Sequence, residues 1–483
     1  MGVVKKIKDL FGITPINIGS LNEEVTGASV EKLPEKPLKP QFESQDPLDG
    51  IEITDEYIKI KELIEAGCPV VFITGNAGTG KSTLIHYLQE ILNKQTVVVA
   101  PTGVAALQAK GVTIHSFFQF PPKLIEKEDV KLVFDRRLYR KLDLLIIDEV
   151  SMVRVDVMDG IDEFLRKNKE NQKPFGGVQL LLIGDLFQLP PVANRNANSL
   201  LRAKGYKSEY FFSAFSLQAV SMIPFELTRT FRQEDKKFIE LLNDLRLAEN
   251  LDHILPIINN RIDTNKLDSP DQIVLTTTNK LADQINGDEL GKLSTREYDF
   301  PGYMQGKFST LDDRLPSPMN LTLREGAHVM FTKNDDQRRW VNGSIGVVRE
   351  LSPDLIRVEV ISSQEKETHQ VNKVTWENYK YEYDDLEDKI VSKVIGKYTQ
   401  YPLMLAWAVT IHKSQGKTLN KVFLNIGHGA FAPGQIYVAL SRVRSLEGIK
   451  LAKAIRESDV ICDSRIKSFY QFIKKSSTAD VTK

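Results

Sequence analysis

The sequence predicts an α/β fold with two parallel-sheet domains and a small β-rich insertion in the second. Apolar runs of strand length, each followed by a turn and a helical stretch, are typical of buried parallel strands. In the first half of the chain these runs lie at 70–73, 96–100, 144–147 and 180–183. A second set lies at 273–276, 403–410 and 422–424. Inside the second set, at about 320–400, short β-rich runs alternate with turns, which indicates an inserted β-barrel.

Length and local composition set the expected domain boundaries. A chain of 483 residues is long enough for about three domains. Residues 31–48 carry four prolines among charged residues, which predicts an extended linker, so the folded body should begin near Asp49. We expect a tail and linker at 1–48, a first domain at 49–225, a second domain at 226–319 and 401–472, the insertion at 320–400, and a C-terminal tail at 473–483.

Overall composition excludes several classes of protein. The hydrophobic fraction of 41% and charged fraction of 27% are ordinary for a globular protein. Cys68 and Cys462 are too few for a disulfide framework or a metal cluster. No apolar run approaches the roughly 18 residues that span a bilayer. We therefore expect a soluble intracellular monomer without membrane contact, cytoplasmic in a prokaryote and nuclear or mitochondrial in a eukaryote. The net charge of zero neither supports nor excludes nucleic-acid binding, because a neutral protein can still line one groove with Lys and Arg.

A phosphate-binding loop is the strongest single signal. Residues Gly75–Ser82 fit the pattern G-x-x-x-x-G-K-[ST], after a predicted strand and at the start of a predicted helix. Glycines let backbone N–H groups surround phosphates, and the following helix points its positive end at them. Lys81 would neutralise the β and γ phosphates, and the Ser82 hydroxyl would hold Mg²⁺. The expected nucleotide contacts are Gly75, Ala77, Gly78, Thr79, Gly80, Lys81, Ser82 and Thr83.

Two adjacent carboxylates follow the strand at 144–147. Asp148 would hold Mg²⁺ together with Ser82, and Glu149 would polarise the attacking water as a general base. Alone, such a pair fits a solvated acidic turn equally well. The phosphate-binding loop upstream favours the catalytic interpretation.

Three later polar residues are candidate γ-phosphate ligands. Gln188 follows the strand at 180–183 and could sense the γ-phosphate. Arg232 and Arg442 could each supply a guanidinium that stabilises charge on the transferring phosphoryl group. An isolated Arg is usually only a surface ion pair. Here the neighbouring sequence favours the catalytic role.

Taken together, the motifs resemble those of superfamily-one DNA helicases. They are GNAGTGKST (75–83), APTGVAA (100–106), GVTIHSFF (111–118), IIDEVSM (146–152), GDLFQLPP (184–191), TFRQ (230–233), TIHKSQGKT (410–418) and YVALSRVRS (437–445). The chain is most similar to the Pif-type family, whose signature region resembles 148–166 followed by 174–185. The resemblance covers about residues 50–452.

This resemblance implies a particular architecture and activity. It implies two RecA-like motor domains with ATP and Mg²⁺ between them, and Gly416 at the nucleotide. Single-stranded DNA would cross both domains, and the motor would move 5′-to-3′ and unwind duplexes, forks and G-quadruplexes from a 5′ overhang. RNA:DNA hybrids remain an open substrate. The insertion resembles a Src-homology-3-like barrel, and 119–141 resembles a small wedge subdomain. The wedge would carry Lys123, Arg136, Arg137, Arg140 and Lys141.

Residues after the strand ends are the expected DNA contacts. Thr102 and Gly103 suit backbone hydrogen bonds to phosphate, while aromatic rings would stack on bases whatever their sequence. The remaining candidates are His115, Ser116, Phe117, Phe187, Thr410, His412 and Lys413. Because Phe117 and Phe118 are adjacent, at most one of the two should face DNA.

One departure from the family concerns the base of the nucleotide. Family members often carry a Gln upstream of the phosphate-binding loop that recognises adenine. The corresponding place lies near Tyr57, and no Gln occurs between Asp46 and Leu88. The preference for ATP over other nucleotides is therefore less well defined than hydrolysis itself.

Three functions remain open at this point. The favoured one is an ATP-dependent 5′-to-3′ DNA helicase of genome maintenance, in replication, repair, recombination or telomere maintenance. A RecD-like translocase subunit of a nuclease complex is the second. A non-motor protein whose DNA binding is regulated by ATP is the third, and candidate arginines and DNA contacts in both halves argue against it.

Overall fold

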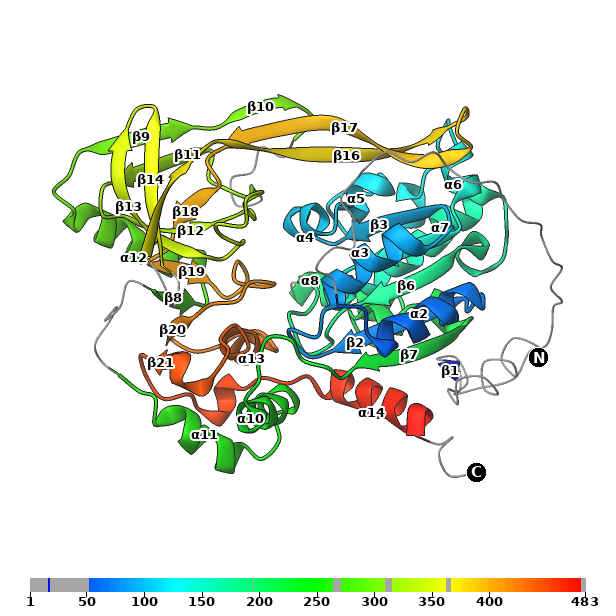
Figure 1. Ribbon diagram of the computed structural model, residues 1–483. Coiled ribbons are helices and arrows are strands. Elements are labelled where there is room, and N and C mark those ends of the chain that lie inside the picture. The colour runs from blue at the N-terminus through cyan, green and yellow to red at the C-terminus, as the bar shows by residue number, and fades with distance from the viewer. Residues whose placement is uncertain are drawn as a thin grey trace.

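Two α/β halves face each other in the computed structural model, which describes residues 16–17, 52–193, 195–263, 271–308, 315–361 and 366–478. A long β hairpin joins the halves on one side and the last helix joins them on the other (Figure 1). Both halves contain parallel sheets, so the predicted α/β class is confirmed. Of the tail expected at 1–48, only β1 (Ile16–Asn17) lies among the described residues.

The first half is built on a seven-stranded sheet in the order β1-β7-β2-β6-β5-β3-β4, in which only β1 pairs antiparallel. Its strands β2 to β7 are Val70–Gly75, Thr96–Ala100, Val112–Thr113, Leu144–Ile147, Gln179–Ile183 and Ser221–Leu227. Its helices α2 to α9 are Asp55–Glu65, Lys81–Ile91, Gly103–Gln108, Ile114–Phe117, Arg137–Lys141, Val155–Lys169, Arg195–Ala203 and Phe215–Gln218. The four strands expected here are therefore present.

Alternation along these strands fills two separate cores. Val71 and Ile73 of β2 pack on the face covered by α2 and α3. Val70 and Phe72 point to the opposite face, where α7 lies. Because both faces are covered, the strands are apolar throughout, as expected for a buried parallel sheet. This layering fixes the carboxyl ends of β2, β5 and β6 at one edge, where the polar turns of the motifs begin.

The second half carries a four-stranded parallel sheet in the order β19-β8-β20-β21. These strands are Ala408–Thr410, Gln272–Thr276, Lys421–Asn425 and Ile449–Leu451. Helices α10 to α13 are Lys236–Leu247, Leu251–Asn259, Asn279–Lys292 and Gln435–Leu440. The single strand expected at 403–410 is wrong: β18 (Leu403–Leu405) pairs with the insertion, and only β19 joins the parallel sheet.

The insertion is antiparallel and begins earlier than residue 320. A five-stranded sheet has the order β15-β14-β13-β12-β18, and β11 pairs with β9. The strands are β9 (Glu297–Pro301), β11 (Asn320–Arg324), β12 (His328–Phe331), β13 (Ile345–Ser352), β14 (Leu355–Ile361) and β15 (Lys366–Val371). Its core contains Phe331, Trp340 and Val358. The Src-homology-3-like identity of this insertion stays a prediction.

A long hairpin extends from the insertion to the first half. It consists of β16 (Val374–Asp384) and β17 (Lys389–Gln400), with β10 (Tyr303–Gly306) on its edge. Its tip lies over α6 (Figure 1). Gln95 Nε2 donates to the Asp388 carbonyl at 3.0 Å, and Ile390 N–H donates to Gln95 Oε1 at 2.8 Å. Tyr381 packs against Phe117, with ring centroids 6.1 Å apart.

The five Lys and Arg residues named for the expected wedge at 119–141 all form ion pairs within the protein. Arg136 and Arg140 both pair with Glu170 on the first half. Lys123 pairs with Asp129. Arg137 and Lys141 pair with Asp385 and Asp388 of the hairpin tip. The wedge role stays a prediction, but Arg137 and Lys141 serve in the present arrangement to hold the hairpin tip.

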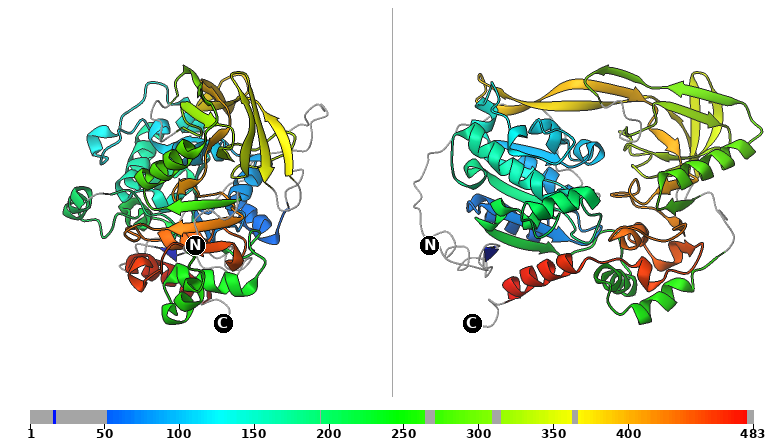
Figure 2. Two further views of the ribbon diagram at one scale, coloured as in Figure 1. Left: turned by 90° about the vertical axis from the view of Figure 1, so that its left-hand side faces the viewer. Right: turned by 180° about the vertical axis from the view of Figure 1, so that it is seen from behind.

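Helix α14 (Ser464–Thr478) crosses the expected boundary at 472–473 and packs on the first half, so that boundary is wrong. Phe469 stacks on Phe212 at 4.2 Å, and Arg465 pairs with Glu209 at 2.7 Å. The rear view shows α14 running beneath the first sheet (Figure 2). The apolar face of α14 needs a partner, and the first half supplies it. The C-terminal segment therefore ties the second half back to the first.

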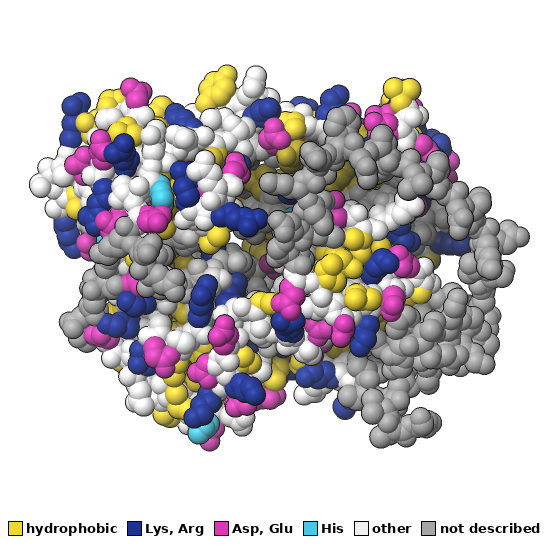
Figure 3. All heavy atoms as spheres, in the orientation of Figure 1, with side chains coloured by type: hydrophobic (Ala, Val, Ile, Leu, Met, Phe, Trp, Pro, Cys, Tyr) yellow, Lys and Arg dark blue, Asp and Glu magenta, His cyan; other side chains and the backbone are white. Residues whose placement is uncertain are grey.

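The surface carries both signs of charge. Lys and Arg side chains are interspersed with Asp and Glu over the face in Figure 3, in keeping with a net charge of zero. Among the described residues, no helix combines the length and the apolar character needed to cross a membrane.

Candidate ATPase site and nucleic-acid interface

The phosphate-binding loop lies between β2 and α3, as the motif requires. Gly78 and Gly80 have φ of 84° and 81°, a conformation that residues with a Cβ adopt at a cost. A Cβ at Gly80 would lie 2.4 Å from the Tyr57 hydroxyl, and one at Gly78 would lie 2.6 Å from the Cβ of Arg232. Both glycines are therefore required by backbone conformation and by space.

Lys81 is held inside the loop. Its Nζ donates to the carbonyls of Gly75 at 2.9 Å and Asn76 at 2.8 Å. Burial lowers the pKa of Lys81, and the nearby carboxylates of Asp185 and Glu149 oppose that shift. The amine is thus positioned where a phosphate oxygen can replace the loop carbonyls as its partner, with a gain in charge.

Asp148 and Glu149 follow β5 and face this loop. Burial raises the pKa of Asp148 to about 6. Burial and then the Asp148 charge raise the pKa of Glu149 to about 7. Glu149 also has φ of 49°, a strained backbone conformation for a residue with a side chain. Strain and raised pKa values at one position are typical of a functional site.

The donor set at this point suits Mg²⁺. A hydroxyl from Ser82 and a carboxylate from Asp148 are hard oxygen ligands, and Mg²⁺ prefers such ligands with several waters retained. Ser82 is exposed while Asp148 is buried, so a cation placed there would have solvent on one side. A divalent charge would also relieve the repulsion between Asp148 and Glu149.

Gln188 links the two halves. It is buried, and its Nε2 donates to Asp185 at 3.3 Å. Its Oε1 accepts from Nε2 of Gln415, which follows β19 in the second half, at 3.1 Å. The predicted sensor therefore touches both halves at once.

The two candidate arginines lie side by side. Arg232 donates to Thr418 Oγ1 at 3.0 Å, to the Ser441 carbonyl at 3.2 Å and to the Gly416 carbonyl at 3.4 Å. Arg442 is buried and donates to the Val438 carbonyl at 2.8 Å. Burial and then the Arg232 charge lower the pKa of Arg442. In these contacts both guanidinium groups donate to carbonyls or hydroxyls, an arrangement that suits the binding of a polyanion.

Arg246 and Tyr437 contact this site directly, although neither was predicted from the sequence. Arg246 of α10 pairs with Asp185 at 3.1 Å. The Tyr437 hydroxyl donates to Asp185 at 3.0 Å and accepts from the Ala77 N–H at 3.0 Å. Tyr437 lies in a quoted motif, so the motif itself was the available signal. Arg246 lies in an ordinary amphipathic helix, and nothing in its local sequence marks it.

Tyr57 occupies the place expected of the adenine-recognising Gln. It is 1% exposed, and its hydroxyl donates to the Gly80 carbonyl at 2.8 Å. That hydroxyl therefore supports the loop. Beside it, the exposed ring of Phe231 lies 3.3 Å from a Cβ built on Gly80, with the Arg229 guanidinium 4.8 Å above the ring.

Most expected DNA contacts lie at facing ends of the two halves. Thr102 caps α4, with its Oγ1 accepting from the Ala105 N–H at 3.2 Å. Gly103 has open space where a Cβ would be, and Ser116, His412 and Lys413 are exposed. The Gln108 side chain of α4 lies within 3.4 Å of a Cβ built on Gly416, so the two ends approach each other.

The remaining candidates are less accessible. Thr410 is buried, and its Oγ1 accepts from the Lys413 N–H at 3.3 Å, so it shapes the turn. His115 is half-buried. Their contact with DNA stays a prediction, and both side chains expose little surface for it.

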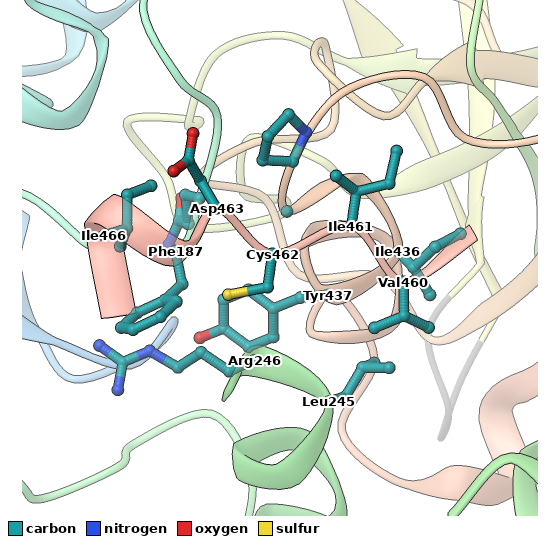
Figure 4. A pocket seen from close by; sticks show the side chains of 13 residues that line it. Phe187, Leu245, Arg246, Ile436, Tyr437, Val460, Ile461, Cys462, Asp463 and Ile466 are labelled. Atoms are coloured by element: carbon teal, nitrogen blue, oxygen red, sulfur yellow. The ribbon is translucent and has the colours of Figure 1, made fainter. Parts of the chain in front are cut away.

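The prediction that Phe117 and Phe187 contact DNA is wrong, because both rings are buried. Phe117 is 7% exposed and packs edge-on against Phe118 at 4.8 Å, so both rings of the pair belong to the core. Phe187 is 3% exposed, edge-on to Tyr470 at 5.1 Å and 4.6 Å beneath the Arg246 guanidinium (Figure 4). In both cases burial by a distant segment overrides what the local sequence suggests.

The fold and the site together define the class of protein. A phosphate-binding loop at the junction of two parallel-sheet domains, with an acidic pair on one side and arginines reaching from the other, is the arrangement of a two-domain P-loop NTPase motor. Nucleotide bound there would contact both domains, so its hydrolysis can change how they pack.

Comparisons with known proteins identify the family. The PIF1-like helicase model matches residues 53–253. The ATP-dependent DNA helicase Pif1 of Bdellovibrio bacteriovorus is 31% identical over 437 residues, which cover 88% of this chain and 93% of that protein. Bacteroides sp Pif1 in complex with ADP-AlF4 superimposes with a TM-score of 0.81 and 38% identity, covering 88% of this chain and 98% of that one. Bacteroides Pif1 bound to ssDNA superimposes with a TM-score of 0.64 and 38% identity, covering 88% of this chain and 98% of that one. The chain belongs to the PIF1-like helicase family.

Burial of Phe117 gives a stability prediction. We expect Phe117→Ala to lower the free energy of unfolding by about 3 to 5 kcal/mol, because it removes a buried ring and leaves a cavity. Urea unfolding measures this. Phe134→Ala is the matched control, because its ring is fully exposed, and it should change stability by less than about 0.5 kcal/mol. Unchanged stability of Phe117→Ala with lost DNA affinity would restore Phe117 to the interface.

The acidic pair gives a pH prediction for the protein without nucleotide and metal. Both carboxyls have raised pKa values, so the folded state binds more protons than the unfolded state between about pH 4 and 7. Stability should therefore fall as pH rises through this window, by up to about 6 kcal/mol more than in the Asp148→Asn/Glu149→Gln double variant. Urea unfolding at pH 5, 6, 7 and 8 tests this. Parallel pH profiles for the two proteins would contradict it.

Proposed function

We propose that this protein is an ATP-dependent DNA helicase that moves 5′-to-3′ along single-stranded DNA and unwinds duplexes and fork junctions. G-quadruplex DNA and RNA:DNA hybrids are further substrates in this proposal, and genome maintenance is its setting, in replication, repair, recombination or telomere maintenance. Membership in the PIF1-like helicase family supports the activity. The Bacteroides relatives crystallised with ssDNA support the substrate.

The observation that carries the proposal is the convergence of both halves on the phosphate-binding loop. Arg232 lies against Gly78 and donates to carbonyls of Gly416 and Ser441 in the second half. Gln188 of the first half accepts from Gln415 of the second. A γ-phosphate at Lys81 would meet these groups only while the domains are together. Hydrolysis removes the anion that they share, so ATP turnover can drive opening and closing.

Nucleotide chemistry is assigned to residues of this loop and its surroundings. Lys81 and the loop N–H groups bind the phosphates, and Glu149 accepts a proton from the attacking water. Ser82 and Asp148 would hold Mg²⁺, which supplies positive charge to the β and γ phosphates. Arg232 and Arg442 stabilise charge on the transferring phosphoryl group. The exposed Phe231 ring offers a stacking surface to the base, which suits any nucleobase.

DNA would cross the facing ends of the two halves. The amino end of α4, with Thr102 and Gly103, supplies backbone N–H donors for phosphate. His412 and Lys413 supply exposed donors from the second half. With one contact surface on each domain, opening and closing moves one surface relative to the other along the strand. Alternating grip then gives net movement.

Loss of the loop lysine or the general base should abolish ATP turnover. We expect Lys81→Ala and Glu149→Gln each to lower kcat for ATP at least about a hundredfold, because charge neutralisation or proton acceptance is lost. A coupled ATPase assay with single-stranded DNA measures it. Lys59→Ala is the matched control, because its side chain is exposed on α2, and it should turn over ATP as the wild type does. Normal turnover in either site variant would show that the site is assigned wrongly.

Direction of movement is tested with partial duplexes. We expect unwinding of substrates with a 5′ single-stranded overhang and not of those with a 3′ overhang, measured by release of a labelled strand. Unwinding from the 3′ overhang alone would reverse the polarity. ATP turnover stimulated by DNA without unwinding by the isolated chain would favour a translocase subunit, and turnover unaffected by DNA would remove DNA as the substrate.

A further inference from the structure

A buried polar cluster joins the two motor domains behind the nucleotide site, and the activities assigned above do not use it. Its members are Ala77 and Asp185 from the first domain and Arg246 and Tyr437 from the second. The cavity beside them has a volume of about 10 Å³, room for no more than one water molecule (Figure 4). Hydrogen bonds in such a site gain strength from the low local dielectric.

The guanidinium of Arg246 is almost completely buried from solvent. Its side chain is 3% exposed and that of Asp185 is fully buried, and their closest approach is 3.1 Å. The rings of Phe187 and Tyr470 lie 4.6 and 5.1 Å from the guanidinium. Burial by itself raises the pKa of Asp185, but Arg246 and then Lys81 hold it below its usual value. A buried pair of this kind adds little net stability, so its value lies in fixing one arrangement of the domains.

Tyr437 connects this pair to the phosphate-binding loop. Its hydroxyl donates to Asp185 Oδ2 at 3.0 Å and accepts from the Ala77 N–H at 3.0 Å, so both of its hydrogen-bonding roles are filled by the first domain. Asp185 in turn accepts from Gln188 Nε2 and from the Phe187 N–H. A displacement of α13 therefore reaches the loop and Gln188 through one hydroxyl and one carboxylate.

Close backbone packing keeps α13 in register with these groups. A Cβ at Gly434, the residue just before α13, would lie 2.3 Å from the Phe187 carbonyl oxygen and 2.7 Å from that of Gln188. On the far side, the Tyr470 hydroxyl of α14 donates to Glu226 at 2.7 Å and accepts from Arg246 at 3.4 Å. The cluster is thus held from both ends, and separation of the domains must break it.

We propose that Tyr437 and Arg246 are positioning residues that transmit closure of the motor domains to the phosphate-binding loop and Gln188. Neither needs to touch the nucleotide. When the domains close, Tyr437 fixes Ala77 in the loop, and Arg246 fixes Asp185, which orients Gln188. When they open, these ties are lost and the catalytic groups are less well aligned. This inference rests on the proposed DNA-stimulated ATPase, since DNA bound across both domains is what would favour closure.

The test compares two tyrosines. Tyr437→Phe keeps the buried ring and removes the hydroxyl. Tyr210→Phe is the matched control, because Tyr210 is also 3% exposed and its hydroxyl donates to a carboxylate other than Asp185, that of Asp463, at 2.9 Å. We expect the ratio of kcat with single-stranded DNA to kcat without it to fall about tenfold in Tyr437→Phe and to stay at the wild-type value in Tyr210→Phe. The KM for ATP should change less than kcat.

A second variant tests the far end of the cluster. Tyr470→Phe should lower the same ratio about two- to threefold, because it frees Arg246 on one side only. Equal ratios in wild type and Tyr437→Phe would overturn the proposal, as would equal loss in Tyr437→Phe and Tyr210→Phe, which would mark a structural effect. If DNA does not stimulate ATP turnover by the wild type, both the proposed function and this positioning role are wrong. If DNA stimulates every variant as strongly as the wild type, only the positioning role is wrong.

Discussion

The phosphate-binding loop of this protein is completed from outside its own domain, and that constraint organises the whole molecule. Arg232 contacts Gly78 from one side, and Tyr437 of the second domain accepts from the Ala77 N–H on the other. The contact of Tyr437 cannot form unless the second domain lies against this end of the first sheet. Everything that links the halves, the hairpin β16–β17 on one side and α14 on the other, therefore bears on the nucleotide site.

Charge at the junction is balanced by groups from both domains. Asp148, Glu149 and Asp185 gather near Lys81. In the first domain alone, three carboxylates would face one amine. Arg246 comes from the second domain and pairs with Asp185, which leaves Lys81 freer for the phosphates. Arg232 and Arg442 meanwhile repel each other until an anion lies between the domains. The phosphates of a nucleotide bound between the domains would supply the counter-charge that these two arginines share.

The two links between the halves differ in physical character. At the hairpin tip, Arg137 and Lys141 form exposed ion pairs with Asp385 and Asp388, which salt screens and which stabilise little. Helix α14 instead buries Phe469 against the first sheet, which is a stronger and less salt-sensitive attachment. Because Tyr381 also packs against Phe117, salt weakens the hairpin link only in part, and it weakens the attachment of α14 less.

Sequence alone determined the central strands of the first sheet, the phosphate-binding loop and the acidic pair. These depend on local patterns: apolar runs bounded by turns, and a loop whose glycines have no substitute. Tertiary structure alone decided the fate of Phe117 and Phe187, which lie in suitable motifs but are covered by segments distant in sequence. It also decided the role of Arg246, the placement of α14 and the split of 403–410 into β18 and β19. Burial and pairing across the chain come from packing between elements, and no local pattern encodes which elements will meet.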